Sequence, residues 1–155
     1  MWKGEPVEGL ELYSLLCSDD EFCAELGRAV LAAGRLETAL KKHILATRSS
    51  PRIVRATLGQ LIKLATKDKL LSEMVPALKG LKVQRNYLTH LVHALFSGFI
   101  EETILPRSNL LDSDVLTFTE RAWLLAQNLN GLAEILEKKC TKPITTGRKV
   151  KRVRI

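Results

Sequence analysis

The run from Leu78 to Phe96, LKGLKVQRNYLTHLVHALF, indicates the fold of this chain. At 100° per residue its apolar side chains share one broad face, which is the pattern of an amphipathic helix seated on a core. The opposite face is a polar arc of roughly 140°. This polar arc brings together a guanidinium, an amide and imidazoles, and it consists of Arg85, Asn86, His90, Lys79, Lys82, Thr89 and His93.

Composition favours the same class of fold. The chain has 155 residues, of which 46% are hydrophobic and only 5% aromatic. A chain of this size can bury one sizeable core, and the abundance of leucine with few β-branched clusters favours helices packed on helices. We therefore predict a single all-α domain, an up-and-down bundle of four to five helices.

Capping signals place the other helices. Ser18-Asp19-Asp20-Glu21 has the spacing of a capping box and should open a helix that runs to about Thr47. Ser50 and Pro51 should open a second helix that ends near Ala65. A third run starts near Asp68 and either ends or kinks at Pro76. A last helix is expected from about Ser113 to Lys139.

Two glycines interrupt the first long helix. Gly27 and Gly34 are seven residues apart and lie nearly on one face. Each costs up to about 1 kcal/mol in a helix interior. We expect the close approach of another helix to offset that cost.

Outside the helices the chain has three further segments. Residues 1–17 form an N-terminal arm that is either a short helix or extended, and residues 18–139 form the bundle. Breakers around Phe99–Leu105 favour a small β-hairpin or an extended loop before the last helix. Residues 140–155 are a basic tail that attracts anions.

Positive charge is concentrated in that tail and in the two lysines before it. The formal net charge is +7, but eight of the 24 Lys and Arg residues lie from Lys138 onward, where there is no Asp or Glu. The rest holds 16 basic and 17 acidic residues, so the body is near neutral in sum. Phosphate attraction at the polar arc should then rely on its own cations, Lys79, Lys82 and Arg85.

The number and spacing of the cysteines, together with the hydropathy of the chain, indicate the cellular compartment. Cys17, Cys23 and Cys140 are an odd number without C-x-x-C spacing, so neither a disulfide framework nor a thiolate zinc site is indicated. No stretch is apolar for the eighteen or so residues of a membrane span, and the first residues lack a signal peptide. We expect a cytoplasmic protein without a membrane partner and without a cofactor.

The polar arc carries groups suited to a phosphodiester. An imidazole can transfer protons near neutral pH, and a guanidinium can fork onto phosphate oxygens and stabilise growing charge. Asn86 can orient either the imidazole or the phosphate. His90 and His93 have no Cys, Asp or Glu at helical spacing beside them, so no metal site is predicted. One copy also lacks the second acid or base of an in-line displacement, which a homodimer would supply.

Arg85-Asn86-x-x-x-His90, on a long helix of a predicted bundle, resembles the R-x4–6-H signature of the HEPN superfamily, in which a polar residue often follows the arginine. The resemblance extends over roughly Ser18 to Lys139. It includes Gly27-Arg28 and Leu36-Glu37 on the first long helix, Leu58-Gly59-Gln60-Leu61, and the final amphipathic helix.

The resemblance implies a metal-independent endoribonuclease that works as a homodimer, toxin-like or defence-like, with RNA as its partner. It implies that the 2′-hydroxyl attacks the adjacent phosphate and leaves a 2′,3′-cyclic phosphate. Carried over, His90 is the general acid or base, Arg85 the phosphate clamp and Asn86 the orienting residue. Lys79, Lys82, Thr89 and His93 are assigned to RNA binding.

Control by a partner protein is less well defined. An antitoxin or a regulatory protein is an expected partner of such an enzyme. The branch of the superfamily neutralised by a nucleotidyltransferase antitoxin has a tyrosine two positions after the histidine, whereas this chain has Val92. That mode of control is not expected here.

Two other interpretations stay open. The first is a non-catalytic HEPN-like module that binds RNA, a nucleotide or a protein partner through the polar arc. The second is a helical scaffold whose polar arc is inert solvated surface. Glu37 can form an ion pair within the bundle and is assigned no chemistry, while His43 is interpreted as a residue favoured at a helix C-terminus.

Overall fold

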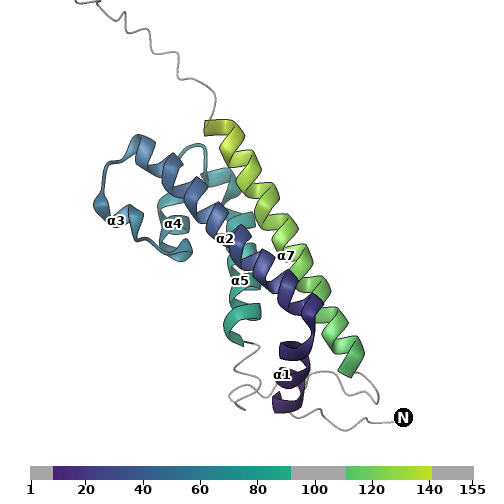
Figure 1. Ribbon diagram of the computed structural model, residues 1–155. Coiled ribbons are helices and arrows are strands. Elements are labelled where there is room, and N and C mark those ends of the chain that lie inside the picture. Colours follow the sequence, from purple (N-terminus) through teal and green to yellow (C-terminus); the bar gives the residue numbers. More distant parts are fainter. Residues whose placement is uncertain (1–8, 92–110, 141–155) are drawn as a thin grey trace, which may run out of the picture.

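The computed structural model describes residues 9–91 and 111–140 of the chain. These residues form six α-helices, one short 3-10 helix and one π-helical turn, and the described part contains no strand (Figure 1). The predicted all-α bundle is confirmed. The segment around Phe99–Leu105, His93 and the tail beyond Cys140 lie outside the described residues.

Two long helices form the backbone of the bundle. Helix α2 (Asp20–Thr47) and helix α7 (Leu111–Cys140) lie side by side over much of their length (Figure 1). Small buried side chains let the two helices approach closely, with leucines between them. The buried positions include Ala29, Ala32, Ala33, Leu36 and Leu40 of α2 and Ala122, Leu125, Ala126, Leu129, Ala133 and Leu136 of α7.

A two-pronged ion pair fixes the relative position of these helices. Arg35 of α2 donates from Nε to Glu137 Oε1 at 3.0 Å and from Nη2 to Oε2 at 2.8 Å. Its Nη1 also donates to Asn130 Oδ1 at 3.1 Å. The hydrogen bond from Arg35 holds the pKa of the Glu137 carboxyl below its ordinary value. This geometry ties the C-terminal part of α7 to the middle of α2.

The helix that carries the polar arc packs against this pair. Helix α5 (Val75–Asn86) buries Leu78 and Leu81, and helix α4 (Leu58–Ala65) buries Leu58 and Leu61 in the same core. Helix α4 contacts both α2 and α5. Helix α1 (Gly9–Ser18) contacts α2 and α7 and buries Leu16, so this part of the predicted arm is helical.

The predicted helix from Pro51 to Ala65 is in fact two helices. Ser50 caps helix α3 (Pro51–Val54) as expected, but α3 has only four residues. Thr57 then starts α4 with a capping box, in which Gln60 N donates to Thr57 Oγ1 and Thr57 N donates to Gln60 Oε1 at 2.9 Å. This local pairing competes with a continuous helix and outweighs the apolar periodicity across residues 55–57.

A tight turn at Asp68 leads into α5. The Asp68 carboxylate accepts hydrogen bonds from Leu70 N at 2.8 Å and Leu71 N at 3.0 Å, and its other oxygen lies 3.4 Å from His43 Nε2. A 3-10 turn, η1 (Ser72–Met74), follows. Pro76 stands in the first turn of α5 and therefore starts a helix instead of kinking one.

Two local predictions for α2 are wrong. Asp19 caps the helix in place of Ser18, and its carboxylate accepts from Phe22 N at 2.6 Å, while the Ser18 hydroxyl donates to the Leu15 carbonyl of α1. Gly27 and Gly34 are exposed, and a Cβ at either would meet nothing within 4 Å. No described helix approaches them closely.

Candidate functional site

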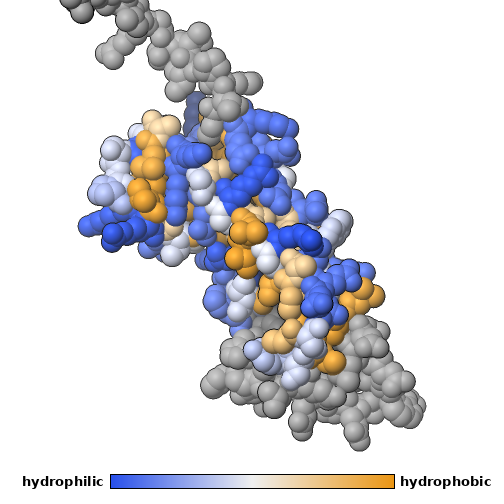
Figure 2. All heavy atoms as spheres, in the orientation of Figure 1, coloured by the Kyte–Doolittle hydropathy of each residue, from blue (hydrophilic) through white to orange (hydrophobic). Residues whose placement is uncertain are grey.

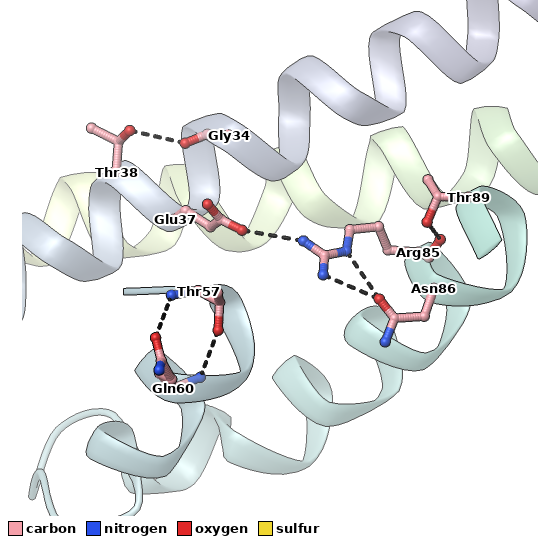
Figure 3. Close-up of polar contacts among 8 residues, drawn as sticks. All are labelled: Gly34, Glu37, Thr38, Thr57, Gln60, Arg85, Asn86 and Thr89. Atoms are coloured by element: carbon pink, nitrogen blue, oxygen red, sulfur yellow. Dashed lines mark hydrogen bonds and ion pairs between the residues drawn. The ribbon is translucent and has the colours of Figure 1, made fainter. Parts of the chain in front are cut away.

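Arg85 is held in place by a carboxylate from another helix. It stands at the end of α5 and reaches toward α2, where its Nη1 donates to Glu37 Oε1 at 3.2 Å (Figure 3). Both side chains are partly buried, with exposed fractions of 26% for Arg85 and 24% for Glu37. The ion pair that Glu37 was expected to form within the bundle therefore has the central residue of the polar arc as its partner.

Asn86 is the second residue that holds the guanidinium, and we call Arg85 with Glu37 and Asn86 the Arg85 cradle. Its Oδ1 accepts from Arg85 Nε at 3.3 Å and from Arg85 Nη2 at 3.1 Å (Figure 3). Asn86 therefore orients the arginine, whereas the sequence predicted that it orients the imidazole or a phosphate. A guanidinium has five N–H groups, and these contacts occupy three of them. Nη1 and Nη2 each keep one N–H that can bind an anion.

His90 lies in a π-helical turn that directly follows α5. This turn, η2 (Tyr87–Leu91), leaves the imidazole exposed, and no described hydrogen bond joins the side chain of His90 to that of Arg85 or Asn86. Hydrogen bonds in a π-helix link residues five apart, which therefore lie about one turn above each other. In a regular α-helix Arg85 and His90 would be about 140° apart around the axis. Arg85 lies in α5, before this turn, so the π-turn changes the direction of His90 relative to Arg85 from that in a regular helix.

Thr89 is used by the backbone. Its hydroxyl donates to the carbonyl of Arg85 at 2.9 Å (Figure 3). The hydroxyl oxygen can then act only as an acceptor toward a ligand, which does not suit contact with a phosphate. Thr89 stabilises the turn that carries His90.

Lys79 and Lys82 lie beside α4 and not beside the Glu37 carboxylate of α2. Both line a groove beside α4, and Arg85, Asn86, Thr89 and His90 do not line it. The Lys82 ammonium lies against the first turn of α4, since a Cβ on Gly59 would stand 3.1 Å from Lys82 Nζ. Gly59 thus makes room for the end of this side chain. The polar arc is divided into a cradle around Arg85 and a basic part beside α4.

The contact of Glu37 with Arg85 could not be predicted from the sequence. The partner of Arg85 is 48 positions away, and the spacing of charges on either helix alone does not reveal the pair. The summed charge of the body, which is near neutral, also does not predict the further cations that line the groove with Lys79 and Lys82. One signal was present: between Glu37 and Asp68 the sequence has no acidic residue and seven Lys or Arg residues.

Other ligand classes find little support in the described part of the chain. No group of three or more His, Cys, Asp or Glu residues gathers there in an arrangement that could hold a metal ion. Cys17 and Cys23 are free thiols. None of the described helices combines the length and the apolar character needed to cross a membrane.

The described side chains can therefore bind an anion and exchange a proton at the end of α5. The cradled guanidinium supplies two free N–H donors, and the exposed imidazole follows on the next turn. Comparison of the chain with protein-family models, with curated proteins and with solved structures returns no match.

Proposed function

We propose that this protein is a metal-independent endoribonuclease of the HEPN type. The observation that supports this proposal most strongly is a guanidinium of Arg85 that Glu37 and Asn86 hold in place, followed in the next turn by an exposed His90 in a π-helical segment. Such turns are rare and occur frequently at functional sites. The metal-free chemistry itself comes from the resemblance of Arg85-Asn86-x-x-x-His90 to the superfamily signature.

The residues divide the reaction among themselves. Arg85 binds the non-bridging oxygens of the scissile phosphate and stabilises the charge that grows there. One His90 accepts the proton of the 2′-hydroxyl as its oxygen attacks phosphorus. The bond to the 5′-oxygen breaks, and that oxygen takes a proton from a second acid. The products are a 2′,3′-cyclic phosphate and a 5′-hydroxyl.

The second acid comes from a second copy of the chain. A recess of about 340 Å³ lies between α5 and α7 next to η2, and it is lined by Val83, Gln84, Tyr87, Leu88, Arg121 and Leu124. Val83 is 65% exposed and Leu124 is 51% exposed. Exposed apolar side chains at a recess favour association, and two of the lining residues, Tyr87 and Leu88, belong to the π-helical turn that carries His90.

The Glu37 ion pair favours a second candidate function. The guanidinium of Arg85 is already partly neutralised, so a phosphate must compete with a carboxylate. A module of the same fold that binds RNA, a nucleotide or a protein partner without turnover would tolerate this arrangement. It predicts binding without cleavage.

The decisive experiment is incubation with labelled RNA in the presence of a chelator. Wild type should cleave, and Arg85→Ala and His90→Ala should lose at least about 100-fold in rate, in line with the loss of one acid–base or charge-stabilising group. Lys41→Ala on α2 is the matched control, because Lys41 does not belong to the cradle, and circular dichroism checks that all variants fold. Equal cleavage by His90→Ala would remove the site assignment, and binding without any cleavage by wild type would favour the second candidate.

A further inference from the structure

A strongly basic groove lies beside α3 and α4 in the described part of the chain. The groove has a volume of about 900 Å³ and is bounded by α3, α4, the end of α2 and the outer side of α5. Six cationic side chains line it, and no acidic residue does. The six are Arg48, Arg52, Lys63, Lys67, Lys79 and Lys82, which we call the groove cations.

The groove cations are not neutralised by the fold. None of them forms an ion pair with another described residue, whereas Arg28, Arg35 and Arg85 each pair with a glutamate. The charge distribution of the chain is polarised in the same way. From Thr38 to Leu91 there are eleven Lys or Arg residues and two Asp or Glu residues, while α7 has five acidic and three basic residues. The near-neutral sum of the body therefore hides a basic side.

The groove adjoins the Arg85 cradle. Lys82 lines the groove, and Arg85 and Asn86 follow it three and four positions later on the same helix, one turn away. An RNA backbone bound in the groove could therefore reach the guanidinium of Arg85 by following the surface of α5.

The lining also limits how a ligand is recognised. Aliphatic side chains such as Ile53, Ile62 and Leu64 are present, but no aromatic ring is. Bases bind single-strand proteins largely by stacking on aromatic rings, so this groove offers little to a base. Backbone phosphates, by contrast, gain from each unpaired cation.

We propose that the groove binds the phosphodiester backbone of a single-stranded RNA, independently of sequence, and directs it to the Arg85 cradle. This inference rests on the proposed ribonuclease function for its substrate, and it adds four residues outside the polar arc: Arg48, Arg52, Lys63 and Lys67. Each contacted phosphate of a single strand contributes about −0.7 to the slope of log affinity against log salt. Six contacts contribute about −4.

The test measures binding of a labelled 12-nucleotide RNA by fluorescence anisotropy between 50 and 200 mM salt. The full-length chain carries His90→Ala, so that RNA is not cut during the titration. Adding Lys63→Glu and Lys67→Glu should weaken binding at least tenfold at the lowest salt and should make the slope shallower by about 1.4, for two lost contacts. Oligo-A, oligo-U and oligo-C should bind with similar affinity.

The matched control reverses the same number of charges outside the groove. Lys41→Glu with Lys42→Glu on α2, two lysines that do not line the groove, should weaken binding much less and leave the groove contribution to the slope intact. Equal weakening by the two double variants would overturn the groove assignment. Competition by poly-glutamate as effective as that by RNA would also overturn it, because the groove would then be a general site for acidic chains.

The two proposals fail in different ways. If wild type cleaves RNA and Lys63→Glu with Lys67→Glu cleaves and binds equally well, the groove is not the RNA path and the ribonuclease remains. If the groove variant loses binding and wild type cleaves nothing, the groove holds and the ribonuclease proposal is wrong.

Discussion

At the scale of single residues, Glu37 is the finding that changes the interpretation of Arg85 most. Its carboxylate lies 3.2 Å from the guanidinium and reduces the attraction of Arg85 for phosphate. The hydrogen bonds that Arg85 donates to Glu37 and to Asn86 also fix the direction in which the remaining N–H groups of the guanidinium point. Glu37 therefore fixes the orientation of the Arg85 guanidinium but lowers its affinity for a phosphate.

Substitution of Glu37 by Gln should separate these two effects. Glutamine keeps an oxygen that can accept the hydrogen bond from Arg85 but removes the charge. RNA affinity should rise by up to about fivefold, as expected for loss of a partly exposed ion pair worth up to about 1 kcal/mol. Anisotropy with labelled RNA measures the effect, and Glu134→Gln on α7 serves as the control. Weaker binding by Glu37→Gln would show that the charge of Glu37 supports the site.

Asp68 makes stability depend on pH. Partial burial raises the pKa of its carboxyl, but hydrogen bonds from the backbone of Leu71 and Leu70 and the nearby His43 outweigh burial and set the pKa below its ordinary value of 3.8. The lower pKa in the folded state means that the carboxylate stabilises the fold fully above about pH 3.8. This contribution is lost as the pH falls through the folded-state pKa.

Asp68→Asn should therefore lose less stability on acidification than wild type. The variant is expected to be less stable at pH 6, because it lacks the charge-assisted hydrogen bonds, and the difference should shrink as the pH falls below about 4. Urea unfolding at a series of pH values measures it. A constant difference across that range would rule out Asp68 as the titrating group.

At the scale of elements, sequence patterns located the helices but not all of their ends. The long helix ending at Thr47 and the last helix were expected nearly as they are observed. The predicted continuous helix from Pro51 to Ala65 is wrong, because the Thr57–Gln60 capping box starts a new helix and outweighs the apolar periodicity. The π-turn at His90 has no sequence signature of its own, so a regular helix was assumed there.

The glycines of α2 give a test at this scale. A packing contact was expected to explain Gly27, but a Cβ there meets nothing within 4 Å. Gly27→Ala should therefore stabilise the protein by up to about 1 kcal/mol, because alanine loses less backbone entropy in a helix. Thermal unfolding should show a midpoint about 2–4 °C higher. Gly59→Ala is the contrast, since its Cβ would press on the end of Lys82 and should give less stabilisation. A lower midpoint for Gly27→Ala would reveal a contact that the described residues do not supply.

At the scale of the whole molecule, the surface separates by character. Apolar side chains alternate with polar ones along the face of α2 and α7 (Figure 2), where Leu31 is 76% exposed and Trp123 is half exposed. The groove cations lie elsewhere on the surface, around α3 and α4. Summed charge could not predict this separation, because it depends on which helices the chain brings together.

Two apolar surfaces compete as the interface of the proposed homodimer. The recess of Val83 and Leu124 adjoins η2, whereas Leu31 lies on the face of α2 and α7. Val83→Glu with Leu124→Glu should convert a dimer to a monomer in light scattering and abolish RNA cleavage, since each copy would lose the partner's His90. Leu31→Glu should stay dimeric and active. The reverse pattern would place the interface on α2 and α7 and contradict the composite site.

The most direct test of the ribonuclease proposal is the end chemistry of the products. An RNA of defined sequence is incubated with the full-length protein in chelator, beside the same RNA with a single 2′-deoxynucleotide at the cleavage position. The proposal predicts a 2′,3′-cyclic phosphate and a 5′-hydroxyl by mass spectrometry, and no cleavage of the deoxy substrate. Products with a 5′-phosphate, or cleavage of the deoxy substrate at the same rate, would contradict attack by the 2′-hydroxyl and with it the roles given to Arg85 and His90.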